Sequence, residues 1–382
     1  MKLLFIERNA LMQQDMEYCL QQLNISYRIA SYVFSDTDHD PYFTEHLRHF
    51  LTEDGYDAVF SFNFIPVIAD VCYDRSMPYI SWCYDAGWEC HRKDAFNYPT
   101  NFIFHFDKKA CEEYQKDGLN RVFYQPLAVN FTRLDRIQTS PSCVEKFTTQ
   151  IAYIGNLYEK RHQNMEQFFS TTVMENLQPF LQQRVVSYGN NTLWDDISAD
   201  YVQAVNALLS GKPLLTRMNI IAMYAAWITH EQRVSCLNKL ADNYQLDLWT
   251  TASNQYVPNA NYRWRANYYS DMPHIFRNAV INLNITLLSI QTGIPLRVMD
   301  ILGAGGFLLS NDQAEFHDYF QVGRDLETFA SEEELLEKVS FYLSHPDSAR
   351  RIAKSGNQQA KLQFDFPDQF RKILHICGFI TS

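Results

Sequence analysis

The sequence predicts an α/β fold with two doubly wound parallel-sheet domains that face a cleft. Three observations support this prediction. The chain has 382 residues, which at roughly 150 residues per domain suggests two domains. Short β-rich runs alternate with helical segments in two separate regions, as in parallel α/β sheets. A polar stretch that contains a proline, 136–142, lies between these regions and is typical of a linker.

The first region supplies the strands of one domain. Its first apolar run, at 3–6, is typical of a buried strand, and apolar residues at helical spacing follow it. The expected strands are 3–6, 27–34, 57–62, 79–82, 102–104 and 121–124. We therefore expect a first domain over 1–135, and the carboxyl ends of its strands should share the edge where ligands bind.

The second region begins with a strand at about 150–154 and is interrupted by a long helical stretch, about 163–243. Further strands are expected at 245–250, 280–284 and 307–309, and further helices at 272–278, 295–302, 331–343, 346–354 and 366–376. We expect a second domain over 148–360 that carries the helical stretch as an insertion. A C-terminal helix within 361–382 could pack back on the first domain.

Composition and charge exclude several classes of protein. The formal charge of −11 argues against a nucleic-acid track, which needs a basic face. The eight cysteines show no C-x-x-C pair or zinc-finger spacing and are typical of reduced thiols. The N-terminus lacks a signal-peptide core, and no apolar run is long enough for a transmembrane segment. The expectation is a cytoplasmic protein.

Two common kinds of site are disfavoured. Gly303, Gly305 and Gly306 follow a helix and precede a strand, whereas a dinucleotide fingerprint follows a strand. They predict a helix C-cap and a tight turn. The carboxylates at 36–40 precede Pro41 and lack the spacing of a calcium loop, so a solvated turn is the simpler interpretation. We expect no metal and no cofactor.

A candidate anion site follows the strand at 280–284. That strand ends at Asn284, and a polar loop runs through Thr292 and Gly293 to a helix that starts at Pro295. The free N–H groups and the dipole of a helix N-terminus bind anions without a basic patch. Gly293 would let the backbone approach a phosphate closely.

Arg297 and Asp300 lie three residues apart on one face of this helix. A guanidinium can bind phosphate oxygens bidentately, and a carboxylate can accept hydrogen bonds from two ribose hydroxyls. The two side chains could also simply pair on the helix surface, and local reasoning leaves both interpretations open.

A second loop carries cations at the start of the second domain. The strand at about 150–154 leads into Gly155 and Asn156, and Lys160 and Arg161 follow. If it faces the cleft, this loop could hold a distal phosphate. An ordinary solvent-exposed loop is the alternative.

Two carboxylates follow strands at the same edge of the first sheet. Glu7 ends the first strand, and Asp85 follows another strand beside Trp82, Tyr84 and Trp88. Carboxylates beside aromatic rings suit sugar recognition and general-base catalysis. The alternative is tryptophan packing with Asp85 as a cap, and the sequence does not choose between the two carboxylates as the base.

Together these segments resemble the CgeB-like family of bacterial glycosyltransferases, named after a spore-maturation protein. The resemblance covers nearly the whole chain. It rests on the segments 268–273, 281–286, 292–297, 300–309 and 343–345, with 60–64, 80–85 and 125–130 in the first domain. The family implies the GT-B fold, in which two Rossmann-like domains bind mainly the acceptor and the nucleotide-sugar donor, respectively.

The resemblance also implies roles for the donor loop. In the wider group of such transferases, two acidic residues eight apart flank this loop. The second falls on Asp300, which would hold the ribose, and the first falls on Thr292, which is not acidic. This departure leaves the stereochemical outcome open. The donor diphosphate would lie at the helix N-terminus, over Ile294 and Pro295.

We therefore expect a metal-independent glycosyltransferase that moves a sugar from a nucleoside-diphosphate sugar to a glycan, protein or small-molecule acceptor. Arg297, with Lys160 or Arg161, would hold the diphosphate, and the helix dipole and cations would replace a metal. The nucleotide base would lie near Tyr268 and Tyr269. The alternatives are a sugar-nucleotide epimerase or hydrolase on the same fold, and a catalytically silent two-lobed ligand-binding protein.

Overall fold

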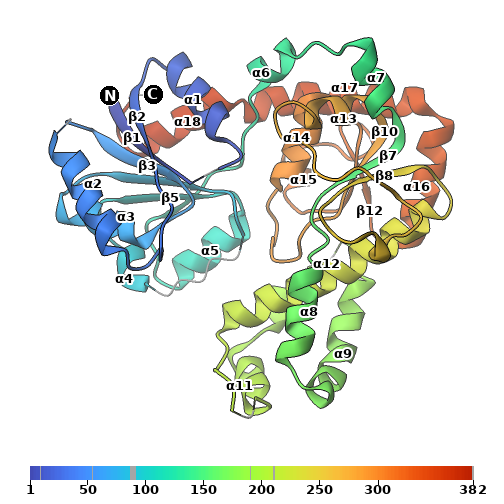
Figure 1. Cartoon of the computed structure of the whole chain (residues 1–382), viewed down its shortest axis with the longest axis horizontal. Helices are drawn as coiled ribbons and strands as arrows, with labels where there is room; N and C mark the ends of the chain where they lie inside the picture. The colour runs from blue at the N-terminus through green and yellow to red at the C-terminus, as the bar shows by residue number, and fades with distance from the viewer. Residues whose placement is uncertain (9, 54, 87–91, 190, 210, 381–382) are drawn as a thin grey trace. The chain divides into compact units, whose positions relative to one another are not determined.

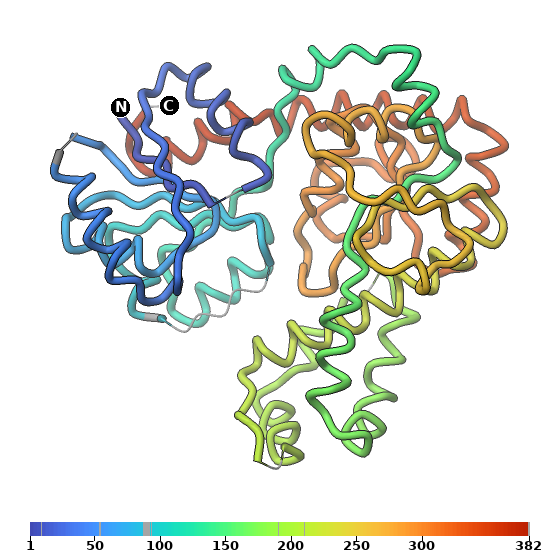
Figure 2. Tube along the Cα trace, viewed as in Figure 1, coloured from blue at the N-terminus to red at the C-terminus, as the bar shows by residue number. Residues whose placement is uncertain are grey.

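The computed structural model describes the chain except for residues 9, 54, 87–91, 190, 210 and 381–382, which are grey in Figures 1 and 2. The chain divides into two compact units. The first comprises Met1–Arg133, Thr292–Leu296 and Phe364–Ser382, and the second comprises Leu134–Gln291 and Arg297–Gln363. Each unit contains a six-stranded sheet, and every pair of neighbouring strands is parallel. The predicted fold class is confirmed.

The sheet of the first unit has the order β2-β1-β3-β4-β5-β6. Its strands are β1 (Lys2–Glu7), β2 (Ser26–Ser31), β3 (Ala58–Phe62), β4 (Tyr79–Cys83), β5 (Asn101–His105) and β6 (Val122–Tyr124). The residues of β3 and β4 are all buried, as expected for a parallel sheet with helices on both faces. The strand order reverses between β1 and β3, which is the switch point where ligands bind in such sheets.

Among the described residues, six helices and the C-terminal helix have at least half of their length in this first unit. They are α1 (Gln13–Gln22), α2 (Pro41–Glu53), α3 (Pro66–Asp74), α4 (Lys93–Phe96), α5 (Lys108–Lys116), α6 (Phe131–Arg136) and α18 (Phe366–Ile376). In α18 the ring of Phe370 packs edge-on against Phe60 of β3, with centroids 5.6 Å apart. The end of the chain therefore contributes to the core of the first unit.

The sheet of the second unit has the order β12-β11-β10-β7-β8-β9. Its strands are β7 (Thr149–Ile154), β8 (Leu246–Trp249), β9 (Asn261–Tyr262), β10 (Ala279–Asn284), β11 (Leu308–Asn311) and β12 (Glu327–Phe329). Counted along the chain, this is the 3-2-1-4-5-6 order of dinucleotide-binding folds, and its switch point lies between β7 and β10.

The remaining helices belong to the second unit or, for α14 and α17, lie mainly in it. They are α7 (Pro141–Phe147), α8 (Glu159–Phe168), α9 (Thr171–Val185), α10 (Leu193–Asp196), α11 (Ala199–Ala207), α12 (Arg217–Ala241), α13 (Met272–Asn278), α14 (Leu296–Ala304), α15 (Phe316–Tyr319), α16 (Glu332–Ser344) and α17 (Pro346–Phe364). Helices α8 to α12 fall between β7 and β8, where the sequence predicted a helical stretch (Figure 1).

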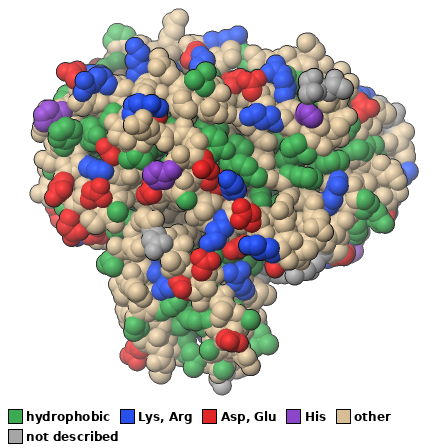
Figure 3. Space-filling view, turned by 180° about the vertical axis from the view of Figure 1, so that it is seen from behind, with side chains coloured by type: hydrophobic (Ala, Val, Ile, Leu, Met, Phe, Trp, Pro, Cys, Tyr) green, Lys and Arg blue, Asp and Glu red, His purple; other side chains and the backbone are tan. Residues whose placement is uncertain are grey.

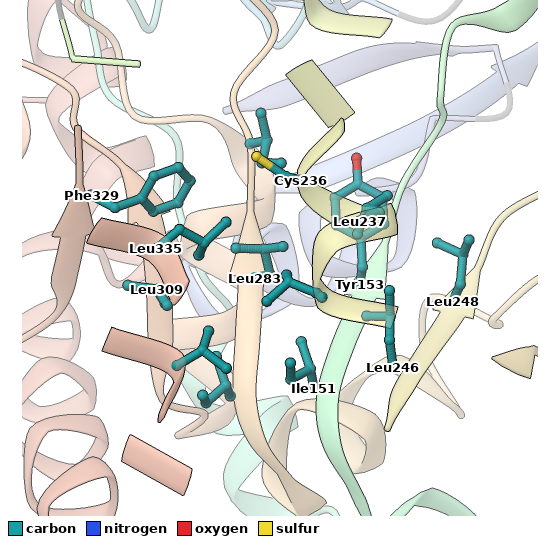
Figure 4. Close-up of a cluster of buried hydrophobic side chains, with 14 of the residues drawn as sticks. Ile151, Tyr153, Cys236, Leu237, Leu246, Leu248, Leu283, Leu309, Phe329 and Leu335 are labelled. Carbon is teal, nitrogen blue, oxygen red and sulfur yellow. The ribbon is translucent and has the colours of Figure 1, made fainter. Parts of the chain in front are cut away.

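The inserted helices have a core of their own, and α12 links it to the sheet. Leu177 of α9, Trp194 of α10 and Tyr224 of α12 are buried together in that core. Further along α12, Cys236 and Leu237 join the cluster that packs on β7, β8 and β10 (Figure 4). Because one 25-residue helix serves both cores, the insertion is fixed to the strands of the switch point.

Gly305 and Gly306 form the tight turn after α14. Gly305 has a left-handed backbone with φ +82, and a Cβ on Gly306 would lie 2.6 Å from the Phe276 carbonyl oxygen. Both glycines follow the end of α14, as the predicted turn requires.

On the face shown in Figure 3, basic and acidic side chains are interspersed, which differs from the single basic face of a nucleic-acid track.

Candidate active site

The switch point of the second unit begins with the tight turn after β7. A Cβ on Gly155 would lie 3.0 Å from the Tyr153 hydroxyl, so a side chain there would disturb the turn. Tyr158 precedes α8 with a left-handed backbone, φ 59, which is uncommon for a residue with a Cβ. The side chain of Asn156 accepts a hydrogen bond from the Tyr158 N–H at 2.5 Å. Thus Asn156 stabilises the turn.

The loop after β10 is held in a similar way. The amide of Asn284 donates to the hydroxyls of Thr286 at 3.0 Å and of Ser310 at 2.9 Å. Asn284 is buried, so its polar group is matched within the protein, as buried polar groups usually are. Asn284 therefore shapes the loop at the end of β10.

Arg233 of α12 joins the two loops of this switch point. Its Nε donates to the Ile285 carbonyl oxygen at 3.1 Å, and its Nη1 donates to the Asn156 carbonyl oxygen at 2.5 Å. The guanidinium carbon also lies 4.9 Å from the ring centre of Tyr158. Arg233 is only 7% exposed, and among the described residues no carboxylate pairs with it. Its charge therefore makes this edge of the sheet electropositive.

Arg297 and Asp300 lie on α14 next to the end of β7. Arg297 Nε donates to the Ile154 carbonyl oxygen at 3.1 Å, and its Nη1 donates to Asp300 Oδ2 at 3.0 Å. The other oxygen of Asp300 accepts a hydrogen bond from the Tyr268 hydroxyl at 2.8 Å. The side chains of Arg297 and Asp300 are 23% and 12% exposed, so the two do pair, but in a partly buried site. Within the described residues, Arg297 Nη2 makes no hydrogen bond.

Lys160 and Arg161 lie in the first turn of α8, a helix of ten residues. Both are exposed, and in the described part of the chain neither forms an ion pair. The Arg161 guanidinium lies 5.6 Å from the ring centre of Tyr158. The free N–H groups of a helix N-terminus add to the positive charge of these side chains.

Tyr269 packs edge-on against Tyr268, with ring centroids 5.0 Å apart.

The segment Thr292–Leu296 belongs to the first unit. The Thr292 hydroxyl donates to Asp107 Oδ1 at 3.0 Å, and the Thr292 N–H donates to Asp107 Oδ2 at 3.3 Å. A Cβ on Gly293 would lie 2.9 Å from the Asp107 Cα, so the missing side chain permits this close backbone approach. The next two residues, Ile294 and Pro295, are buried.

The two candidate base residues of the first unit differ in exposure. Glu7 is 4% exposed, and its oxygens accept hydrogen bonds from the Ala10 N–H at 3.0 Å and the Ser31 hydroxyl at 3.3 Å. Asp85 is exposed and accepts a hydrogen bond from the Asn63 amide at 2.7 Å. Asp85 is therefore the more accessible carboxylate.

Of the two interpretations of the aromatic residues beside Asp85, the packing interpretation holds for Trp82. Trp82 is fully buried, and its ring packs against Tyr84 and Phe366 with centroids 5.6 and 5.3 Å apart. A buried ring cannot stack on a sugar, so Trp82 is a core residue. Trp88, another of the aromatic residues named beside Asp85, lies outside the described residues.

Sequence reasoning missed three polar residues near these edges. His105 ends β5 and Asp107 follows it, and the His105 ring nitrogen Nδ1 accepts a hydrogen bond from the Asp107 N–H at 3.1 Å. Burial lowers the pKa of His105. Both residues could have been found, because polar side chains after a predicted strand are candidates at the carboxyl edge. Arg233 carries no such signal, since it lies inside a helix 77 residues from Asn156.

A family model described as glycosyl transferase-like matches residues 232–375. The matched region contains Arg233, Tyr268, Arg297 and Asp300. Among curated proteins, no sequence matches the chain. None of the described helices has both the length and the apolar character that a bilayer crossing requires.

Solved structures resemble the whole chain in fold. Sucrose-phosphate synthase from Thermosynechococcus elongatus superposes with a TM-score of 0.59 at 8% identity, covering 99% of this chain and 98% of that one. HepE from Anabaena, in complex with UDP and glucose, gives 0.57 at 10% identity, covering 100% of both chains. A glycosyltransferase from Rickettsia africae gives 0.55 at 9% identity, covering 98% and 97%. The chain thus has the two-domain GT-B fold of glycosyltransferases, and its second unit carries most of a glycosyltransferase-like region.

Proposed function

We propose that the protein is a glycosyltransferase that takes a nucleoside-diphosphate sugar as its donor and binds it at the switch point of the second unit. The observation that carries the proposal is the unmatched positive charge there. Arg233 is buried without a carboxylate partner among the described residues, and it lies in the region that the glycosyl transferase-like model matches. A diphosphate is the kind of ligand that such charge stabilises.

Each of the four cations has a proposed role in binding the diphosphate of the donor. Arg297 Nη2 would donate to a phosphate oxygen, while Nε and Nη1 remain on Ile154 and Asp300. Lys160 and Arg161 would bind the distal phosphate at the N-terminus of α8. Arg233 would act through its charge, because its donors already reach backbone carbonyls.

Asp300 would hold the ribose of the donor. Its two oxygens accept hydrogen bonds from Tyr268 and Arg297, and a carboxylate oxygen can accept from more than one donor, so a ribose hydroxyl would join these groups. Tyr268 would then fix the rotamer of Asp300, and Tyr269 beside it would lie near the nucleotide base.

The proposed reaction is transfer to an acceptor hydroxyl. The hydroxyl oxygen bonds to the anomeric carbon as the bond from that carbon to the diphosphate breaks, and the hydroxyl proton passes to a base. Asp85 is the better supported base because it is exposed, with Glu7 as the alternative. The cations and helix termini would stabilise the leaving diphosphate without a metal.

A binding screen followed by a turnover assay tests this proposal. UDP and UDP-glucose come first, because HepE of similar fold was solved in complex with them, and GDP, dTDP and CMP sugars follow. A bound donor should raise the thermal midpoint by mass action. Nucleotide release that requires an acceptor supports a transferase. Release without an acceptor would indicate a hydrolase, and binding without any turnover in a broad acceptor screen would contradict an enzymatic role.

A further inference from the structure

A cluster of metal-ligating side chains lies apart from the groups assigned to the donor, between α8 and α12. His162 of α8 and His230 and Glu231 of α12 each offer one ligand atom, and these atoms lie within 4.8 Å of one another. The ring centres of the two histidines are 4.3 Å apart, and His162 Nε2 lies 2.9 Å from Glu231 Oε1. Three possible ligands from two packed helices thus lie close together.

The surroundings leave a nitrogen of His230 available to bind a cation. Its Nδ1 lies 2.7 Å from the Leu157 carbonyl oxygen. A carbonyl can only accept, so Nδ1 carries the proton and the lone pair is on Nε2. This carbonyl–histidine contact is the kind that orients metal-binding histidines in proteins. His230 is 3% exposed, so the packing around it holds this orientation.

His162 and Glu231 are also positioned by their neighbours. The His162 ring stacks on Trp227, with centroids 5.3 Å apart and planes 14° from parallel, so its orientation is fixed. Glu231 Oε1 lies 2.9 Å from His162 Nε2, so the carboxylate is directed toward this imidazole. The side chain of His162 is 13% exposed and that of Glu231 is 36% exposed, so solvent can reach the cluster from one side.

We propose that His162, His230 and Glu231 bind a divalent cation of the zinc type. Two imidazoles and one carboxylate are a donor set that Zn²⁺ accepts, whereas Mg²⁺ and Ca²⁺ prefer oxygen ligands. Water would complete the coordination, or Glu166, whose Oε2 lies 3.7 Å from His162 Nδ1 one turn along α8. Because the ligands come from two helices, the cation would link α8 to α12.

The cation would stabilise the local structure and would not take part in the transfer of the sugar. Helix α8 starts at the turn after β7, and α12 carries Arg233, which holds that same turn. A cation between the helices would therefore fix the turn from both sides. The inference does not depend on the proposed function, because the cluster uses none of the groups assigned to the donor.

The test uses the full-length protein, freed of metal by a chelator and then titrated with Zn²⁺ by calorimetry. We expect one equivalent to bind and to raise the thermal midpoint. Co²⁺ in its place should give the visible absorption spectrum of a tetrahedral or five-coordinate site. His162→Gln and Glu231→Gln should each weaken Zn²⁺ binding at least about tenfold, because losing even a residue that only orients a metal ligand typically costs about 10- to 100-fold in affinity.

His317→Gln is the matched control. His317 is exposed and pairs with Asp312 at 3.0 Å, so it represents an ordinary surface histidine–carboxylate pair of the same unit. It should leave Zn²⁺ affinity unchanged. Wild-type affinity in Glu231→Gln and His162→Gln, or no stoichiometric binding by folded wild-type protein, would overturn the proposal. Circular dichroism verifies that each variant is folded, and the half-exposed Glu231 keeps the test decisive if the His162 variant unfolds.

Discussion

Replacing Arg297 with alanine should weaken binding of a nucleoside diphosphate by about 1.5–3 kcal/mol. The magnitude follows from how the guanidinium is used. Nε and Nη1 are taken up by Ile154 and Asp300, which leaves Nη2 for the ligand. One hydrogen bond of the charged kind from Nη2 is worth about 1.5–3 kcal/mol. The dissociation constant should therefore rise about 10- to 150-fold.

Calorimetry on folded protein measures this effect directly, with the nucleoside diphosphate that gives the largest thermal shift. Arg297→Lys should bind with intermediate affinity, because an ammonium keeps the charge but cannot serve three partners in a planar fork. Arg350→Ala is the matched control, since Arg350 also pairs with an aspartate three residues away, Asp347, on an exposed helix. It should change affinity by less than about twofold. Wild-type affinity in a folded Arg297→Ala protein would refute the assignment.

Three further predictions concern the same site. Asp300→Asn should weaken binding of a ribonucleoside diphosphate more than binding of inorganic pyrophosphate, because only the former presents a ribose; equal losses in calorimetry would contradict the role of Asp300. Asp85→Asn or Glu7→Gln should lower kcat at least tenfold and leave donor affinity within about twofold, since a positioned base contributes ~10²–10⁴-fold; full kcat in both variants would exclude both carboxylates as the base. Turnover should survive excess EDTA well below the thermal midpoint, even if EDTA lowers that midpoint; activity lost to EDTA and restored by Mn²⁺ or Mg²⁺ would show that the leaving diphosphate needs a metal.

The strands of both sheets could be predicted where they are buried. The runs at 58–62 and 79–83 contain one serine each and are otherwise apolar or aromatic, because both faces of a parallel sheet are covered. The second sheet has two strands that the sequence did not reveal. They are β9 with two residues and β12 with three, both at sheet edges. Such short runs give too few residues for a periodic pattern.

The polar stretch predicted as a linker, 136–142, lies inside the second unit, which starts at Leu134. Pro141 in this stretch is the first residue of α7. The Ser140 hydroxyl accepts a hydrogen bond from the Cys143 N–H at 3.3 Å, and proline fits the first turn of a helix. The same residues that signal a break therefore also start a helix.

The candidate site shows what strand-end reasoning can and cannot find. It pointed to Gly155, Asn156 and Asn284 because the carboxyl ends of parallel strands share an edge. It could not find Arg233, which lies in the middle of α12 and has no neighbouring motif that signals a role. Its role follows only from the packing of α12 on the switch point. Strand-end reasoning also could not choose between a ligand-facing and a core position for Trp82, because an aromatic residue at a strand end looks the same in the sequence in both cases.

Hydrogen exchange with and without the best-binding nucleoside diphosphate tests the central claim most directly, that the donor binds at the switch point of the second unit. A ligand there should slow exchange of backbone amides in the turn and first helical turn at 155–161 and along 284–300, because it orders both loops. Arg297→Ala should reduce that protection at the same ligand concentration. Protection confined to other segments, or none at a concentration that saturates binding, would contradict the account.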